Sequence, residues 1–356
     1  MQNMDFTPDF QRILAQNAKR RGCAVPLYLL APSGFSMEAQ RNERALARLI
    51  DAGFYVINPQ VVTRRYQRFA GHDDERLADL RALLAMTVAE LPKIVLSVRG
   101  GYGAMRLLDG LTADEWRALA TKLAARGTLV VGFSDLTAIE LALLAHGGLP
   151  TVAGVMLSGD IGAPVPNAFT MQHFVDLCQG MPLDVRVDTP QPHVVHGAST
   201  AITGTLWGGN LTVLSALVGT PYLPQIDGGI LLLEDVGEQP YRLERMLQTL
   251  RLSGVLARQQ ALLLGQFSMG KLTDAYAQDY DLAAVVAYLH AQTGLPIYTD
   301  FPFGHVPSRV SVPLGVTLTL TAVQGGAAGY RAQCAPYFGL QDETFAERLD
   351  FARLFD

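Results

Sequence analysis

The chain has 356 residues, 49% of them hydrophobic, which is enough for about two domains that each bury an apolar core. Its 28 basic and 33 acidic side chains give a net charge of −5, and no Lys/Arg block is present to collect phosphates, which argues against nucleic acid as a partner. The cysteines at positions 23, 178 and 334 show no CxxC spacing. We therefore expect no zinc, haem or redox site and a reducing, cytoplasmic location.

The first apolar run, at residues 25–31, follows three basic residues at 19–21, an order that also begins secretion signals. Pro26 and Pro32 bracket this run, and no small-residue cleavage pattern follows it. We therefore expect a buried strand instead of a signal. No apolar stretch reaches the length of a membrane span, so we expect no membrane partner.

Short apolar runs then alternate with amphipathic ones, which is typical of strands that feed crossover helices in a parallel sheet. The expected strands lie at residues 27–31, 54–57, 94–98 and 129–131, and the expected helices at 38–52 and 76–88. In such a sheet the loops after the strands line one crevice. The turns at Arg99 and Gly132 should therefore open into the same cleft.

The apolar rhythm weakens between residues 162 and 197, where prolines gather, and this composition predicts a connection between domains. Beyond it we expect strands at 230–233, 261–265 and 316–322, the last one at an exposed edge, and helices at 242–252 and 282–293.

Three glycines follow the strand expected at residues 94–98, in the segment Arg99-Gly100-Gly101-Tyr102-Gly103. Their bare backbone N–H groups could approach a ligand closely and cradle an anion or an oxyanion. A tight strand-to-helix turn has the same composition, and the glycines alone favour that simpler interpretation.

A serine follows the next apolar run, in Gly132-Phe133-Ser134-Asp135-Leu136. A serine on a strand-to-helix turn projects its hydroxyl into the cleft, and the N–H groups of the first helical turn can face a developing negative charge. Leu136 stands where the usual G-x-S-x-G turn has glycine. A simple helix cap explains Ser134 equally well.

A serine nucleophile needs a base and a group that orients the base. His305 differs from the other histidines because it lies in a loop after a probable strand, although most loop histidines bond only to backbone. The other six lie in or beside helices or in the proline-rich connection, at positions 72, 146, 173, 193, 196 and 290.

The orienting acid is Glu234 or Asp235, which end the strand expected at 230–233. Ionised groups in such a half-buried place need a reason to be there. A salt bridge to Arg242 or Arg245 is the alternative, and the residues alone do not choose between the two acids.

Taken together, these segments resemble the LD-carboxypeptidase family of serine peptidases. The motifs that carry the resemblance span most of the chain and come in the family's order: residues 30–34 (LAPSG), 68–71 (RFAG), 98–104 (VRGGYGA), 132–139 (GFSDLTAI), 204–211 (GTLWGGNL), 219–221 (GTP), 233–236 (LEDV), 303–305 (FGH) and 313–315 (PLG).

The resemblance implies Ser134 as the nucleophile, His305 as the base and Glu234 as its orienting partner. Backbone N–H groups of Gly101 and Asp135 would then form the oxyanion hole. The implied reaction removes the terminal D-alanine from murein tetrapeptides, at the L-configured centre of the third-position diamino acid, and needs no metal or organic cofactor. A homodimer is also implied.

The implied fold is α/β, with an N-terminal α/β/α domain whose sheet is mostly parallel, a smaller β-rich C-terminal domain, and the active site between them. We place an N-terminal extension at residues 1–24, the first domain at 25–165, a linker at 166–198, the second domain at 199–336 and a C-terminal extension at 337–356.

The substrate-binding candidates are Gly100, Arg99, Arg106 and Trp207. A carboxypeptidase must recognise a free carboxylate, which suits Arg99 and Arg106, although Arg106 could instead form a bridge within its own helix. Trp207 could be the aromatic platform that a rival activity needs, the cleavage of a peptidyl-nucleotide by an immunity-type relative. A non-catalytic binding module is the rival from another class.

Overall fold

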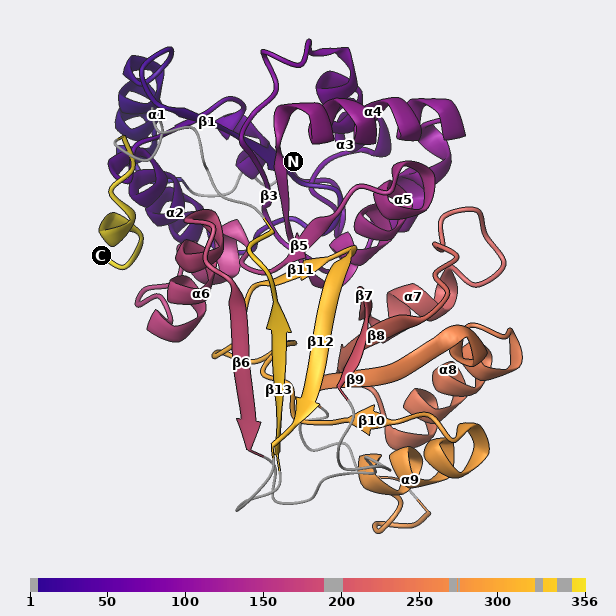
Figure 1. Ribbon diagram of the computed structural model, residues 1–356. Coiled ribbons are helices and arrows are strands. Elements are labelled where there is room, and N and C mark those ends of the chain that lie inside the picture. Colours follow the sequence, from indigo (N-terminus) through magenta and orange to yellow (C-terminus); the bar gives the residue numbers. More distant parts are fainter. Residues whose placement is uncertain (1–5, 189–200, 269–273, 275, 324–328, 338–347) are drawn as a thin grey trace.

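The computed structural model describes residues 6–188, 201–268, 274, 276–323, 329–337 and 348–356. Within them the chain forms two sheets, one above the other in Figure 1, with helices against both. The predicted mixed α/β class, with a mostly parallel first sheet and a second domain, is confirmed. No helix among these residues combines the length and the apolar character needed to cross a bilayer.

The first sheet has the strand order β11-β5-β4-β3-β1-β2, and its strands β1 to β5 are parallel. Their bounds are Val25–Leu30 (β1), Phe54–Val56 (β2), Ile94–Ser97 (β3), Leu129–Gly132 (β4) and Thr151–Ala153 (β5). The short apolar runs are buried because helices cover both faces of the sheet. On one face lie α1 (Asp9–Lys19), α2 (Ala39–Asp51) and α6 (Ala168–Cys178), and on the other α3 (Asp73–Ala85), α4 (Ala113–Arg126) and α5 (Thr137–Gly147).

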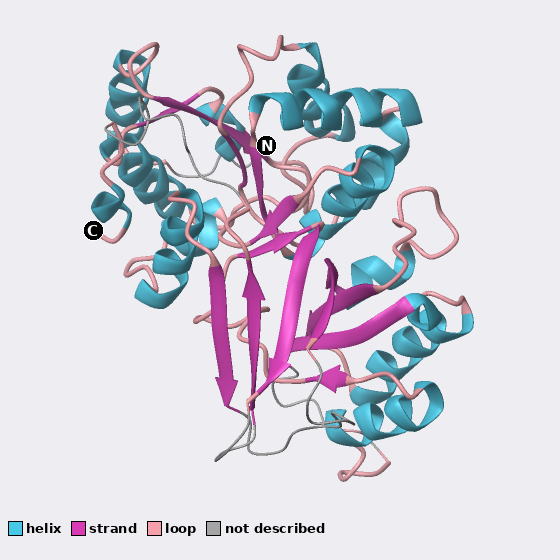
Figure 2. Ribbon diagram, viewed as in Figure 1, coloured by secondary structure: helices cyan, strands magenta, loops and turns pink. Residues whose placement is uncertain are grey.

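The second sheet has the order β10-β9-β8-β7-β12-β13-β6, with its first four strands parallel and the other three antiparallel. Its strands are β6 (Leu183–Asp188), β7 (Ile202–Asn210), β8 (Gly229–Val236), β9 (Gln259–Ser268), β10 (Ile297–Tyr298), β12 (Val316–Ala322) and β13 (Gly329–Cys334). The helices α7 (Leu211–Ala216), α8 (Pro240–Leu252) and α9 (Leu282–Thr293) pack beside its parallel part, as Figure 2 shows.

Two strands cross between the halves of the chain. β11 (Val312–Leu314), from the second half, pairs antiparallel with β5 in the first sheet. β6, from the first half, pairs antiparallel with β13 in the second sheet (Figure 1). Apolar side chains of α5, α7 and α8 also belong to one continuous core cluster. The two halves therefore share their packing.

Three expectations differ from the structure. The segment predicted as a connection contains α6 and β6, because its prolines flank these elements instead of interrupting them; residues 189–198 lie outside the described part. The strand predicted at an exposed edge is β12, which pairs with β7 and β13 on its two sides. The first 24 residues include α1, whose Phe10 and Ile13 are buried in the core of the first sheet.

Candidate active site

Ser134 lies at the turn between β4 and α5, where the chain leaves the carboxyl end of the sheet. Its φ angle is +63°, in the left-handed region that non-glycine residues enter only at a cost in free energy. A strained strand-to-helix turn of this kind projects the serine hydroxyl away from the backbone, where a substrate can reach it. The N-cap position of the short helical turn is occupied by Phe133, so Ser134 begins this turn and does not cap it.

The structure brings together the three side chains that the resemblance singled out. His305 Nε2 lies 3.0 Å from Ser134 Oγ, and His305 Nδ1 lies 2.7 Å from Glu234 Oε2. An ionised carboxylate can only accept, so Nδ1–H donates to Glu234 and Nε2 is left to accept the serine proton. This is the hydrogen-bond order of a nucleophile, a general base and an orienting acid.

Glu234 is fully buried at the carboxyl end of β8. Its second oxygen, Oε1, accepts a 3.1 Å hydrogen bond from Asn210 Nδ2. Asn210 is the register partner of Glu234 in the parallel pair β7–β8. A Cβ on Gly304 would lie 3.0 Å from Glu234 Oε2, so the glycine leaves room for the histidine to reach the acid. Asn210 is a residue that the sequence analysis missed, although the register of two parallel strands would have pointed to it.

Asp235, the other acid of the pair, faces away from the histidine. Its carboxylate accepts hydrogen bonds from the N–H and the hydroxyl of Thr212, at 2.9 and 2.8 Å, at the start of α7. Burial raises the pKa of Asp235, and the bonds from Thr212 act in the opposite direction. The suggested salt bridge of Arg242 goes instead to Glu238, at 3.6 Å. Asp235 therefore anchors α7, and Glu234 is the acid at the histidine.

The glycine turn after β3 lies directly against the serine. A Cβ on Gly100 would be only 2.8 Å from both Cβ and Oγ of Ser134, and 3.6 Å from the backbone N of Asp135. The Asp135 carboxylate fixes the two turns to each other, because it accepts from Ser33 Oγ at 2.6 Å and from Ala104 N at 2.8 Å. Burial raises the pKa of Asp135, and these two hydrogen bonds counter that effect. The turns at Arg99 and Gly132 thus meet, as the parallel topology predicts.

The His305 loop is held by residues from the first half of the chain. Arg309 forms an ion pair with Asp160 and donates to Val306 O at 2.9 Å, and its guanidinium carbon lies 4.3 Å from the Phe133 ring centroid. Phe133 also stands 5.0 Å from the His305 ring, centroid to centroid. These contacts keep the histidine over the serine.

The four substrate-binding candidates have different surroundings. Gly100 touches the serine, as described above, and the Arg99 guanidinium donates from Nη1 to Phe35 O at 3.1 Å beside the glycine turn. Arg106 Nη2 is 2.5 Å from Asp73 Oδ2, so its bridge runs to α3 and not within its own helix. Trp207 does not form an aromatic platform for a ligand. Its indole is 1% exposed in the core, and its N–H donates to Gln259 Oε1 at 2.9 Å.

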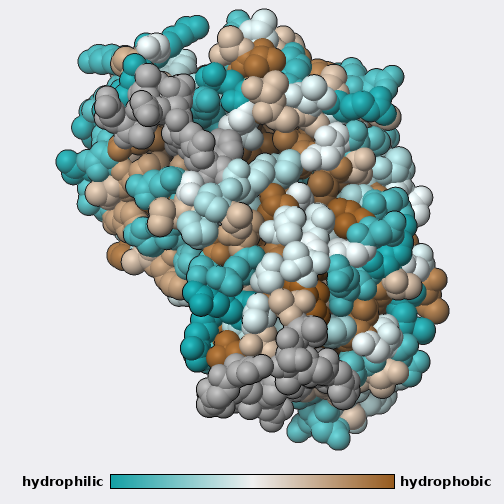
Figure 3. All heavy atoms as spheres, in the orientation of Figure 1, coloured by the Kyte–Doolittle hydropathy of each residue, from teal (hydrophilic) through white to brown (hydrophobic). Residues whose placement is uncertain are grey.

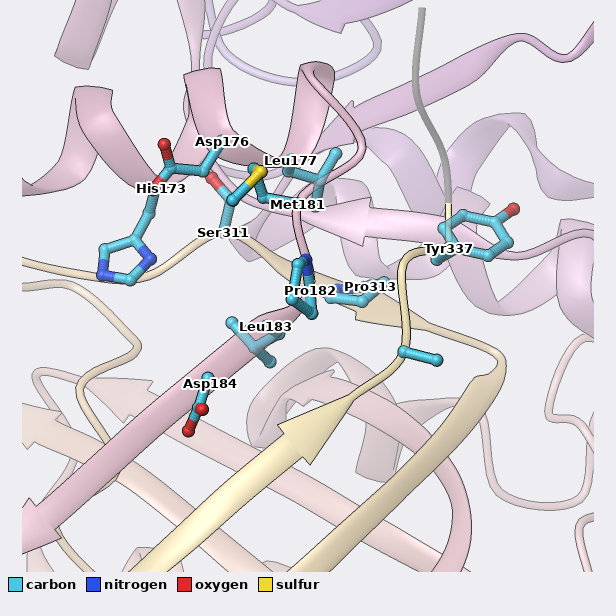
Figure 4. Close-up of a pocket in the computed structure, with 11 residues that line it drawn as sticks. His173, Asp176, Leu177, Met181, Pro182, Leu183, Asp184, Ser311, Pro313 and Tyr337 are labelled. Atoms are coloured by element: carbon cyan, nitrogen blue, oxygen red, sulfur yellow. The ribbon is translucent and has the colours of Figure 1, made fainter. Parts of the chain in front are cut away.

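A hollow away from these residues lies beside α6. Figure 4 shows a cavity of about 110 Å³ between α6 and β6, lined by residues such as His173, Asp176, Met181 and Tyr337. On the face drawn in Figure 3, hydrophilic and hydrophobic residues are interspersed.

Among the residues that the structure describes, no cluster of three or more His, Cys, Asp or Glu side chains is arranged to hold a metal ion. His193 and His196 lie outside the described residues.

Comparisons with known proteins agree with this architecture. The model of the LD-carboxypeptidase N-terminal domain matches residues 27–154, and that of the LD-carboxypeptidase C-terminal domain matches residues 203–320. The murein tetrapeptide carboxypeptidase of Pseudomonas aeruginosa is 34% identical over 267 residues, which cover 73% of this chain and 81% of that protein.

Solved structures give the same result. A muramoyltetrapeptide carboxypeptidase from Oxalobacter formigenes superposes with a TM-score of 0.76 at 35% identity, over 88% of this chain and 99% of that one. The microcin C7 self immunity protein MccF shares the fold at 19% identity, with a TM-score of 0.72 over 88% and 97% of the two chains. The chain belongs to the LD-carboxypeptidase family of serine peptidases.

Proposed function

We propose that the protein hydrolyses the bond between the L-configured centre of the third-position diamino acid and the terminal D-alanine of murein tetrapeptides. The observation that carries the chemistry is the His305 ring, within hydrogen-bond distance of both Ser134 Oγ and Glu234 Oε2. The choice of substrate is supported by the names of two similar proteins, each over 30% identical to this chain.

In this reaction Ser134 attacks the carbonyl carbon while His305 takes the hydroxyl proton at Nε2, and Glu234 stabilises the imidazolium that forms. His305 then gives the proton to the departing D-alanine amine, and water hydrolyses the acyl-enzyme. The backbone N–H groups of Gly101 and Asp135 hold the oxyanion, an interaction whose loss typically lowers the rate by ~10² to 10³-fold. The missing Cβ of Gly100 leaves room for the attack.

The test compares an L,D-tetrapeptide with its all-L isomer and follows released alanine by mass spectrometry. We expect release from the L,D-peptide alone, and at least about a 10³-fold loss of kcat in Ser134→Ala and His305→Ala. A fluorophosphonate probe should label Ser134. Absence of both labelling and release would favour a non-catalytic binding module.

Cleavage of a peptidyl-nucleotide is the rival activity. It needs an aromatic surface for the base, which the buried Trp207 does not supply. Adding such a substrate to the same assay tests this directly, and turnover faster than that of the tetrapeptide would reverse our choice.

We also propose that the protein acts in the cytoplasm as a homodimer and without a metal. Sedimentation of the purified protein tests the dimer, and a monomer at micromolar concentration would contradict it. Full activity after dialysis against EDTA is the result expected from a triad of Ser134, His305 and Glu234.

A further inference from the structure

Several arginines lie at the glycine turn or in the segments near it, and they differ in whether they have an acidic partner. Arg64 pairs with Asp79 at 2.6 Å, while Arg76 and Arg106 both pair with Asp73. In contrast, Arg68 and Arg99 form no ion pair with any Asp or Glu of the described residues. The charge of Arg68 lowers the pKa of the buried Asp135, but that carboxylate is already bonded to Ser33 and Ala104. In a chain of net charge −5, two neighbouring cations without an ion pair indicate a place for an external anion.

These two arginines are held next to each other by the backbone. Phe35 links them, because its carbonyl accepts from Arg99 Nη1 at 3.1 Å and its N–H donates to Arg68 O at 3.3 Å. Arg68 is exposed on a tight turn in which Gln67 has a φ of +50°. The Arg68 guanidinium carbon lies 5.4 Å from the ring centroid of Tyr102, a residue of the glycine turn itself.

The pair is also close to the nucleophile. A Cβ on Gly101 would lie 3.6 Å from Arg99 Nη1, and a Cβ on Gly100 would lie 2.8 Å from Ser134 Oγ. Burial lowers the pKa of Arg99, and the charge of Arg68 lowers it further, so the two cations repel each other. An anion between them would relieve that repulsion.

We propose that Arg68 and Arg99 together bind the terminal carboxylate of the peptide whose last bond Ser134 cleaves. This inference rests on the proposed function. In such a peptide the carboxylate lies one residue beyond the scissile carbonyl, within about 4 Å of it, and the carbonyl itself lies at the Gly101 N–H. Arg106, which Asp73 already engages, takes no part.

This assignment explains why the enzyme would remove only a terminal residue. A peptide that continues past the cleavage point would present a neutral amide to two guanidinium groups, and these would lose their charge-assisted hydrogen bonds. A murein tetrapeptide carries other carboxylates, on its second and third residues, and these share the same chemistry. The test must therefore tell the terminal carboxylate from the others.

The test measures binding to a Ser134→Ala background, so that no peptide is consumed. Three L,D-tetrapeptides are compared by calorimetry: the free acid, its C-terminal amide, and a form amidated only at the second residue. We expect the free acid to bind about tenfold to hundredfold more tightly than the C-terminal amide. Arg68→Gln should reduce this ratio to about threefold or less by weakening binding of the acid alone, and Arg68→Lys should keep part of it.

The matched control is Arg117→Gln, which removes an exposed arginine of α4 that pairs with Asp114. It changes net charge equally and should leave the acid-to-amide ratio unchanged. The inference is overturned if Arg68→Gln keeps the full ratio, if it lowers only the preference for the second-residue carboxylate, or if the free acid does not bind. Failure of the wild-type protein to release D-alanine, with the acid-to-amide ratio intact, would instead overturn the proposed function alone.

Discussion

At the scale of single residues, Asn210 shows how a side chain with no chemistry of its own can govern a site. Its Nδ2 lies 3.1 Å from Glu234 Oε1 and 3.3 Å from Asp235 Oδ1, so it donates to both buried acids. Its Oδ1 accepts from Val213 N at 3.1 Å and caps α7. Asn210 therefore fixes the acid and the helix start together.

Asn210→Asp keeps the shape of the side chain and the cap of α7. It replaces the amide that donates to Glu234 Oε1 and Asp235 Oδ1 with a carboxylate oxygen that faces these two acids. We expect kcat to fall by about tenfold to hundredfold with little change in KM, as for partners of a reacting group. Steady-state kinetics on the tetrapeptide measures this. Asp281→Asn, the opposite exchange at the cap of the distant α9, is the control and should leave both constants unchanged. An equal loss in the two variants would contradict a role of Asn210 at the triad.

Glu140 is a second residue whose environment has a measurable consequence. It lies on α5, is 2% exposed, and neither of its oxygens has a hydrogen-bond partner among the described residues. Burial raises its pKa well above the ordinary value of 4.5. The folded protein therefore keeps the carboxyl neutral to a higher pH than the unfolded chain, which ionises it above pH 4.5.

Because the folded pKa is raised, the contribution of Glu140 to stability is complete at low pH and is lost as the pH rises. Above pH 4.5 the free energy of unfolding should fall by about 1.4 kcal/mol per pH unit from this group, up to its folded pKa. Glu140→Gln should remove that decline, which urea denaturation between pH 4.5 and 7.5 would measure. The exposed Asp227→Asn is the control and should keep it. An unchanged slope in Glu140→Gln would show that the carboxyl is ionised when folded.

At the scale of elements, the turn between β4 and α5 stores strain at its serine. Ser134→Gly and Ser134→Ala both remove the hydroxyl and differ only in Cβ. Left-handed backbone costs a residue with Cβ about 1–2 kcal/mol, which offsets the ~0.5–1 kcal/mol that glycine usually loses through chain entropy. We therefore expect Ser134→Gly to be as stable as Ser134→Ala, or up to about 1.5 kcal/mol more stable.

The same pair of substitutions at Ser215, within α7, gives the reference. There the glycine variant should be the less stable one by roughly 1 kcal/mol, because its backbone is helical. Chemical denaturation measures all four variants. If glycine were equally unfavourable at both positions, the turn would carry no strain.

At the scale of the whole molecule, the exchange of β6 and β11 makes the two halves depend on each other. Each sheet contains a strand from the other half, and one core cluster holds both Trp116 of α4 and Trp207 of β7. The triad needs this arrangement, since Ser134 comes from the first half and the acid and base from the second. We infer that the molecule unfolds as one unit.

The chain contains two tryptophans, one in each half, so single-tryptophan variants can test this. In Trp207→Phe the remaining Trp116 reports the first half, and in Trp116→Phe the remaining Trp207 reports the second. Within each variant, the fluorescence midpoint should coincide with that of the far-ultraviolet circular dichroism. A tryptophan signal that changes at a different denaturant concentration would indicate halves that unfold separately.

The sequence alone determined the class of fold, the family and most of the elements, because these depend on local signals. Short apolar runs such as residues 94–98 and 129–131 are typical of strands in a sheet that helices cover on both faces. The glycine and serine motifs mark the turns after these strands. The tertiary structure decided everything that depends on a partner far along the chain. This includes the register that puts Asn210 beside Glu234, the crossing of β6 and β11, the burial of Trp207, and the lack of an ion pair at Arg68 within the described part of the chain. Periodicity describes which face of a segment is apolar, but it carries no information on which distant segment will cover that face.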